Sequence, residues 1–181
     1  MKKVIGIVLF TVLNLSLNAQ FTKARLQATG LTCAMCSNAI NKALQKVSFV
    51  QSVSPDIKNS AFDIVFKEGS DVDVDVLKKA VEDAGFSVGS LWLTATFNEL
   101  KIFNDEHVKL GKENFHFVNV CNRVLNGEIT IRVLDKDFVT AKEFKKFSAA
   151  TKMRCMQTGK TGPCCVKEGM AEGERVYHVT I

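Results

Sequence analysis

The sequence predicts an α+β protein, with a two-layer βαββαβ sandwich at residues 20–97 and a small, mostly β domain at residues 98–181. Three observations lead to this prediction. Short segments alternate in hydrophobicity between turn residues, two other segments repeat apolar residues at helical spacing, and strand-like patterns dominate the second half. The 181 residues are 46% hydrophobic and 24% charged, a composition that excludes intrinsic disorder and a polytopic membrane protein.

The first half contains four predicted strands and two predicted helices. The strands are expected at residues 21–28, 49–53, 61–66 and 90–97. The first helix follows from apolar residues at helical spacing between Ala39 and Val47. The second helix begins after an Asp-rich segment, repeats apolar residues from Val74 to Ala84, and ends at Gly85.

The second half is predicted to fold around strands. Residues 115–124 and 128–134 have strand patterns, and the Asn126-Gly127 pair between them is typical of a hairpin turn. Thr140 and Glu143 fit a capping box at the start of one short helix, and residues 175–181 alternate as a closing strand. We therefore expect a small barrel, with an OB-like layout as the working guess.

The first nineteen residues have the order of a secretory signal peptide. A basic start at Lys2-Lys3 precedes an apolar run from Val4 to Leu13, and small residues precede Gln20. The apolar run is too short to span a bilayer, so we expect an exported, periplasmic or secreted protein without stable membrane insertion. Removal of this leader leaves 22 basic and 19 acidic residues and no basic stripe, which argues against nucleic acid as a partner.

Two of the six cysteines form a C-x-x-C pair between the first predicted strand and the first predicted helix. The segment reads Gly30-Leu31-Thr32-Cys33-Ala34-Met35-Cys36. At a helix N-terminus the dipole favours thiolates, and this spacing brings both sulfurs within reach of one ion. Two thiolates with few other ligands favour Cu(I), whereas Zn(II) prefers four ligands. A thiol–disulfide redox pair and a structural disulfide are the alternatives for Cys33 and Cys36.

These residues resemble the heavy-metal-associated domain family, the ferredoxin-like module of copper chaperones, copper-ATPase N-terminal domains and mercury-binding periplasmic proteins. The resemblance covers about residues 21–97 and rests on the C-x-x-C segment and on Glu82–Phe86. It implies that Cys33 and Cys36 bind the metal. Gly30, Leu31, Thr32 and Phe86 would support the metal loop, with Leu31 replacing the usual Met and Phe86 packing against the loop without ligation.

The resemblance also implies a metal donor or acceptor protein, such as a transporter, as the partner. Cu(I) is the expected ion, with Hg(II), Zn(II) and Cd(II) as alternatives. Residues 98–181 resemble no family, and the oligomeric state is open.

The other four cysteines lie in the second half, at Cys121, Cys155, Cys164 and Cys165. One or two disulfides that cross-link a small domain are the first interpretation. The second is another soft-metal site, with Met153, Met156 or Met170 as additional ligands. His107, His116 and His178 are interpreted as ordinary strand or surface histidines, because no H-x-H or H-x-x-x-H pairing supports ligation.

The expected function is therefore an exported soft-metal-binding protein that sequesters the ion or transfers it by thiolate ligand exchange. No phosphate loop, G-x-S-x-G, H-E-x-x-H or paired-carboxylate pattern occurs, so the protein is not expected to be an enzyme. A periplasmic thiol–disulfide redox protein and a disulfide-containing structural or docking protein are the alternatives.

Overall fold

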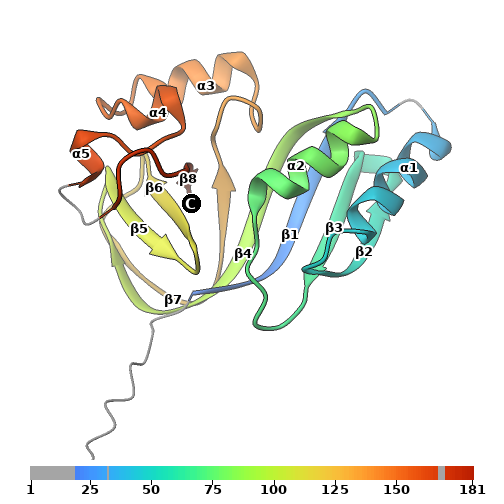
Figure 1. The fold of residues 1–181 in the computed structure, drawn as a ribbon, viewed down its shortest axis with the longest axis horizontal. Helices are drawn as coiled ribbons and strands as arrows, with labels where there is room; N and C mark the ends of the chain where they lie inside the picture. The colour runs from blue at the N-terminus through green and yellow to red at the C-terminus, as the bar shows by residue number, and fades with distance from the viewer. Residues whose placement is uncertain (1–18, 32, 167–169) are drawn as a thin grey trace, which may run out of the picture.

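The computed structural model describes residues 19–31, 33–166 and 170–181 and contains one eight-stranded sheet. The strand order is β2-β3-β1-β4-β7-β8-β6-β5, so the first and second halves of the chain each supply one side of the sheet. Figure 1 shows the first half with two helices on one face of the sheet, and the second half with its short helices grouped at one end. The predicted signal peptide lies outside the described residues except for Ala19.

The first half is the predicted βαββαβ sandwich. Its elements are β1 (Gln20–Thr29), α1 (Ala34–Gln45), β2 (Val50–Asp56), the 3-10 turn η1 (Ile57–Asn59), β3 (Ala61–Phe66), α2 (Val74–Asp83) and β4 (Ser87–Ile102). Its strand pairs are antiparallel. Ile40 and Leu44 of α1, and Leu77 and Val81 of α2, are fully buried against the sheet. This burial is the reason for the helical spacing seen in the sequence.

Strand β4 links the two halves without a break. It pairs with β1 on one side and with β7 (Arg123–Val133) on the other, and it crosses the predicted domain boundary at residues 97 and 98. The separate barrel expected for residues 98–181 is not confirmed, because the strands of the second half continue the sheet of the first half. Period-two patterning marks a strand but carries no information about which strand pairs with it.

The predicted hairpin at Asn126-Gly127 is wrong. Both residues lie inside β7, and Gly127, at φ +77°, sits where the register between β4 and β7 shifts. A glycine at positive φ suits a β-bulge as well as a turn, so the same residue pair fits both. The hairpin instead joins β5 (Glu106–Leu110) to β6 (Glu113–Phe117) through a two-residue turn, Gly111-Lys112.

The last part of the chain contains three short helices and the final strand. They are α3 (Ala141–Ser148), α4 (Cys155–Thr158), α5 (Pro163–Val166) and β8 (Val176–Thr180). The capping box at α3 is confirmed, since Thr140 and Glu143 bond each other's backbone N–H groups. Strand β8 runs parallel to β6 and antiparallel to β7. Among the described residues, no helix is both long and apolar enough to cross a bilayer.

Candidate metal centre

The structure places Cys33 and Cys36 together at the start of α1. Cys33 is the N-cap residue with extended backbone, and Cys36 lies in the first turn of the helix. The backbone N–H groups of Cys36 and Ser37 donate to the Cys33 carbonyl oxygen at 3.1 and 3.3 Å. This turn brings the two Sγ atoms to 2.9 Å from each other. Two sulfurs this close present one joint set of ligands to a single ion.

Three of the four predicted supporting residues, Gly30, Leu31 and Phe86, lie in the described part of the chain. Gly30 adopts φ +82°, and a Cβ at this position would lie 3.9 Å from the Phe86 ring. Leu31 and Phe86 are half-buried and pack against the main core. Phe86 therefore lies next to Gly30, just after α2 and against the core. Thr32 lies outside the described residues.

The cysteine pair is open to solvent. Cys33 is exposed, Cys36 is half-buried, and Met35 between them is 82% exposed. Figure 1 shows the loop between β1 and α1 at one end of the molecule, away from the second half of the chain. A thiolate from another protein can therefore approach this pair without a change in the fold.

Comparison with known proteins identifies this unit. A family model for the heavy-metal-associated domain matches residues 25–87. The copper chaperone CopZ of Staphylococcus haemolyticus is 34% identical over 59 residues, which cover 33% of this chain and 85% of the chaperone. The chain belongs to the heavy-metal-associated domain family.

Other relatives contain the heavy-metal-associated (HMA) domain within much longer chains. The copper-transporting ATPase RAN1 of Arabidopsis thaliana is 39% identical over 64 residues, which are 35% of this chain and 6% of the ATPase. The crystal structure of a copper-binding domain from HMA7, a P-type ATPase, is 36% identical, with a TM-score of 0.34, over 37% of this chain and 89% of that domain. The family model matches no residue beyond 87.

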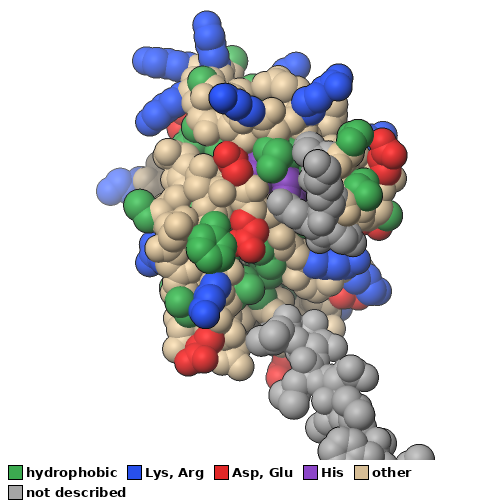
Figure 2. Space-filling view, turned by 90° about the vertical axis from the view of Figure 1, so that its left-hand side faces the viewer, with side chains coloured by type: hydrophobic (Ala, Val, Ile, Leu, Met, Phe, Trp, Pro, Cys, Tyr) green, Lys and Arg blue, Asp and Glu red, His purple; other side chains and the backbone are tan. Residues whose placement is uncertain are grey.

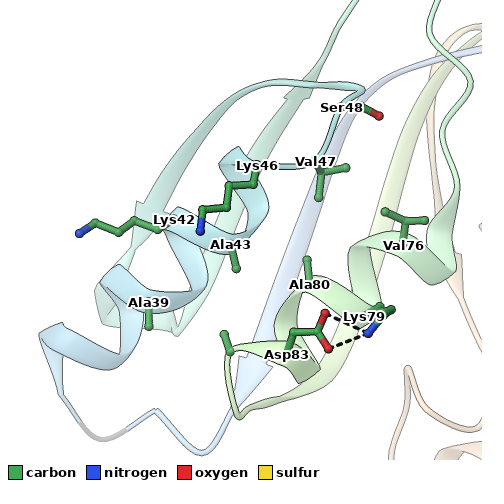
Figure 3. A pocket seen from close by; sticks show the side chains of 11 residues that line it. Ala39, Lys42, Ala43, Lys46, Val47, Ser48, Val76, Lys79, Ala80 and Asp83 are labelled. Carbon is green, nitrogen blue, oxygen red and sulfur yellow. Dashed lines mark hydrogen bonds and ion pairs between the residues drawn. The ribbon is translucent and has the colours of Figure 1, made fainter.

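A groove between the two helices of the HMA domain has a volume of about 740 Å³ (Figure 3). Small apolar residues line its floor, and Lys42, Lys46 and Lys79 lie around it, with Lys79 bonded to Asp83 at 2.7 Å. None of the residues that line this groove is a cysteine, histidine or methionine. The groove therefore offers no soft ligand for a metal ion.

The four remaining cysteines differ in their burial and in their position in the fold. Cys121 is exposed and free, in the segment between β6 and β7. Cys155 and Cys165 are buried in one cluster with Met170 and the half-buried Met153. Cys164 precedes Cys165 in α5, and its side chain lies outside the described part of the chain. Met156 packs elsewhere, against Val118, Leu134 and Val139.

Sequence reasoning missed the histidines of this region. His107, His116 and His178 are 7%, 0% and 0% exposed, and strand pairing places them side by side. Burial, together with the nearby His178 and His107, lowers the pKa of His116 to about 2, so the His116 ring is neutral. One signal was present in the sequence. His107 and His116 lie at equal distances from the Gly111-Lys112 turn, so a hairpin centred there pairs them directly.

Proposed function

We propose that this protein is an exported soft-metal carrier that holds one Cu(I) ion between Cys33 and Cys36 and passes it to a partner protein. The observation that carries the proposal is the pair of sulfur atoms 2.9 Å apart in an exposed loop at a helix N-terminus. Thiolates are the ligands that Cu(I) selects, and two thiolates leave the ion open to attack. The relation to copper chaperones and copper-ATPase domains supports the same ion.

Transfer proceeds by ligand exchange. A thiolate of the partner attacks the bound ion while Cys33 and Cys36 still hold it, and a three-coordinate intermediate forms. One of the two original sulfurs then leaves, and the second thiolate of the partner replaces the other. The exposure of Cys33 and the position of the loop at one end of the molecule permit this approach. The partner is a metal donor or acceptor, such as a transporter, and the signal-peptide pattern at residues 1–19 supports export.

Anaerobic titration of the reduced chain with Cu(I), against a competing chelator, tests the proposal. The wild-type chain and the Cys121→Ser control should each bind one more tight equivalent of Cu(I) than Cys33→Ser/Cys36→Ser. Cys121 is a matched control because it is also an exposed cysteine, in a different part of the fold. Equal numbers of tight Cu(I) equivalents in the double variant and the wild type would refute the assignment.

A thiol–disulfide redox role is the second candidate, and the same sulfur separation favours it. The S–S bond of a disulfide is about 2.0 Å long, so the pair has less than 1 Å to close. The test is the reduction potential of the Cys33–Cys36 pair together with disulfide reductase turnover. A potential in the oxidoreductase range with turnover would replace the carrier by a redox protein.

A further inference from the structure

The second half of the chain gathers histidine and cysteine side chains into one buried cluster. His107 of β5 and His116 of β6 are directly opposed in the hairpin, and their rings stack with centroids 4.4 Å apart. Directly opposed residues of an antiparallel pair point to the same face of the sheet. Cys155 and Cys165, from the short helices α4 and α5, reach these rings from segments about 40 to 60 residues further along the chain.

The distances between ligand atoms fit one shared ion. Cys155 Sγ lies 3.5 Å from His107 Nε2 and 3.8 Å from His116 Nδ1, and these three atoms are all within 4.8 Å of one another. Cys165 Sγ lies 3.4 Å from the same His107 Nε2. With metal–sulfur bonds of about 2.3 Å and metal–nitrogen bonds of about 2.0–2.1 Å, a tetrahedral ion separates its sulfur and nitrogen ligands by about 3.6 Å.

Hydrogen bonds between the thiols and the imidazole rings explain these contacts less well than a shared metal ion does. His107 Nε2 has two sulfur atoms within 3.5 Å. A ring nitrogen offers one N–H or one lone pair, so it makes one good hydrogen bond. A metal ion takes the lone pairs of all these ligands at once, and it removes the cost of burying several polar groups together.

We propose that His107, His116 and Cys155, with Cys165 beside them, form a buried soft-metal site separate from the Cys33–Cys36 pair. Imidazole nitrogen together with thiolate sulfur is the ligand set of Zn(II) and of copper. The ligand class is therefore a single thiophilic ion, either Zn(II) or Cu(I). Such an ion joins the β5–β6 hairpin to α4 and α5, as a disulfide was expected to do.

A carboxylate lies in position to orient one of the ligands. Asp105 Oδ1 is 3.3 Å from His116 Nε2, on the side of the ring away from the cysteine. Both atoms are buried, and neither forms a hydrogen bond of good geometry among the described residues. A metal at Nδ1 places the proton on Nε2, directed at this carboxylate. Metal-bound histidines usually donate their second N–H to a carboxylate or carbonyl oxygen in this way.

Methionine side chains near the site favour a soft ion, and a groove beside Cys155 gives an ion access to it. Met170 is 8% exposed and lies with the half-buried Met153 in the same cluster as the two cysteines. A groove of about 820 Å³ lies beside Cys155 and is also lined by Met153 and Pro163. Figure 2 shows histidine surface beside hydrophobic side chains on one face of the molecule. Of the three histidines, His107 is the most exposed, at 7%.

The two metal sites serve different purposes. Figure 1 places the β1–α1 loop and the α4–α5 region at opposite ends of the molecule, so one ion cannot bridge them. The first site is exposed and presents two sulfurs, whereas the second is buried and mixes nitrogen with sulfur. An exposed pair suits exchange with a partner. A buried mixed site suits an ion that stays in the protein.

Co(II) binding to the Cys33→Ser/Cys36→Ser chain, reduced and stripped of metal, tests the proposal. This background removes the exposed pair, so its result is independent of whether Cys33 and Cys36 bind copper. We expect one equivalent of Co(II) with a thiolate-to-metal charge-transfer band and the ligand-field spectrum of a tetrahedral site. Zn(II) should displace it. Incubation with equimolar Zn(II) and Cu(I), followed by metal analysis, identifies the preferred ion.

Ligand variants in the same background give the decisive comparison. Adding Cys155→Ser or His116→Gln should abolish the charge-transfer band or weaken Co(II) binding by at least about 100-fold, whereas Cys121→Ser should leave both unchanged. Asp105→Asn should weaken Co(II) binding by about 10–100-fold. This variant tests the proposal even if Cys155→Ser and His116→Gln fail to fold. The proposal is overturned if the background chain shows no charge-transfer band, or if the folded Asp105→Asn and Cys121→Ser chains bind equally.

Discussion

Replacing Arg175 with Met should destabilise the whole chain, because Arg175 joins the HMA domain to the second half. Its guanidinium donates to both carboxylate oxygens of Asp75 in α2, at 2.9 and 3.4 Å, and to Asp135 Oδ2 at 3.1 Å. It also lies 4.2 Å from the centroid of the Tyr177 ring. The Asp135 side chain is 9% exposed and bonds His178 Nδ1 at 2.6 Å, so it depends on these two partners.

The expected loss follows from this burial. Removing one member of a buried ion pair costs about 3–5 kcal/mol, because the remaining charge is left without compensation. Asp75 is 42% exposed, and water replaces part of what it loses. We therefore expect the free energy of unfolding to fall by about 3 kcal/mol, near the lower end of that range. For a chain of this length, that loss lowers the Tm by about 6–12 °C.

Urea unfolding, followed by fluorescence, measures this change. Trp92 is the single tryptophan and lies in β4, between the strands of the two halves. Lys23→Met is the matched control, because the Lys23–Glu128 pair at 2.9 Å has side chains 58% and 52% exposed. An exposed pair contributes about 0–1 kcal/mol. Adding Asp135→Asn to Arg175→Met should recover part of the lost free energy of unfolding, because it removes the charge that Arg175→Met leaves without compensation. If Arg175→Met costs no more than Lys23→Met, the joining role of Arg175 is refuted.

Three further changes test local features. Gly30→Ala should lower the free energy of unfolding by about 1 kcal/mol in urea titration, because Gly30 adopts φ +82° and the added Cβ itself meets no close neighbour. Phe86→Ala should weaken Cu(I) binding by at most about tenfold in chelator competition, because Phe86 packs behind the loop without ligating. Thr140→Ala should cost about 1 kcal/mol in urea, because it removes the capping box of α3.

Each of these changes has its own check. Gly30→Ala without any loss of stability would mean that the loop adopts another backbone conformation. A Cu(I) affinity for Phe86→Ala as low as that of Cys33→Ser/Cys36→Ser would make Phe86 part of the binding site. Lys142→Ala on the exposed face of α3 is the comparison for Thr140→Ala, and equal stability of the two variants would contradict the capping role.

Local patterns in the sequence predicted the HMA domain well. The alternation at residues 21–28 and 61–66 became β1 and β3, and the apolar spacing around Ile40 and Leu77 became the buried faces of α1 and α2. The capping box at Thr140 is likewise a local feature, closed within four residues. Features of this kind depend on residues close together in the sequence, so they can be predicted without knowing the fold.

Pairing between distant strands could not be read in the same way. The Asn126-Gly127 pair predicted a turn, yet β4 pairs with β7 on both sides of these residues and makes the glycine part of a bulge. The extension of β4 to Ile102 likewise depends on β7, which begins at Arg123. A strand shows which face is apolar, but its partner is decided by the rest of the sheet.

The same distinction separates the two groups of cysteines. Cys33 and Cys36 lie one helical turn apart, so the sequence by itself determined that their sulfurs meet at the start of α1. His107 and His116 meet through a hairpin, and Cys155 reaches them from a helix about 40 residues further along the chain. Only the tertiary structure decided that second group, because contacts between residues far apart in the chain depend on how every intervening element packs.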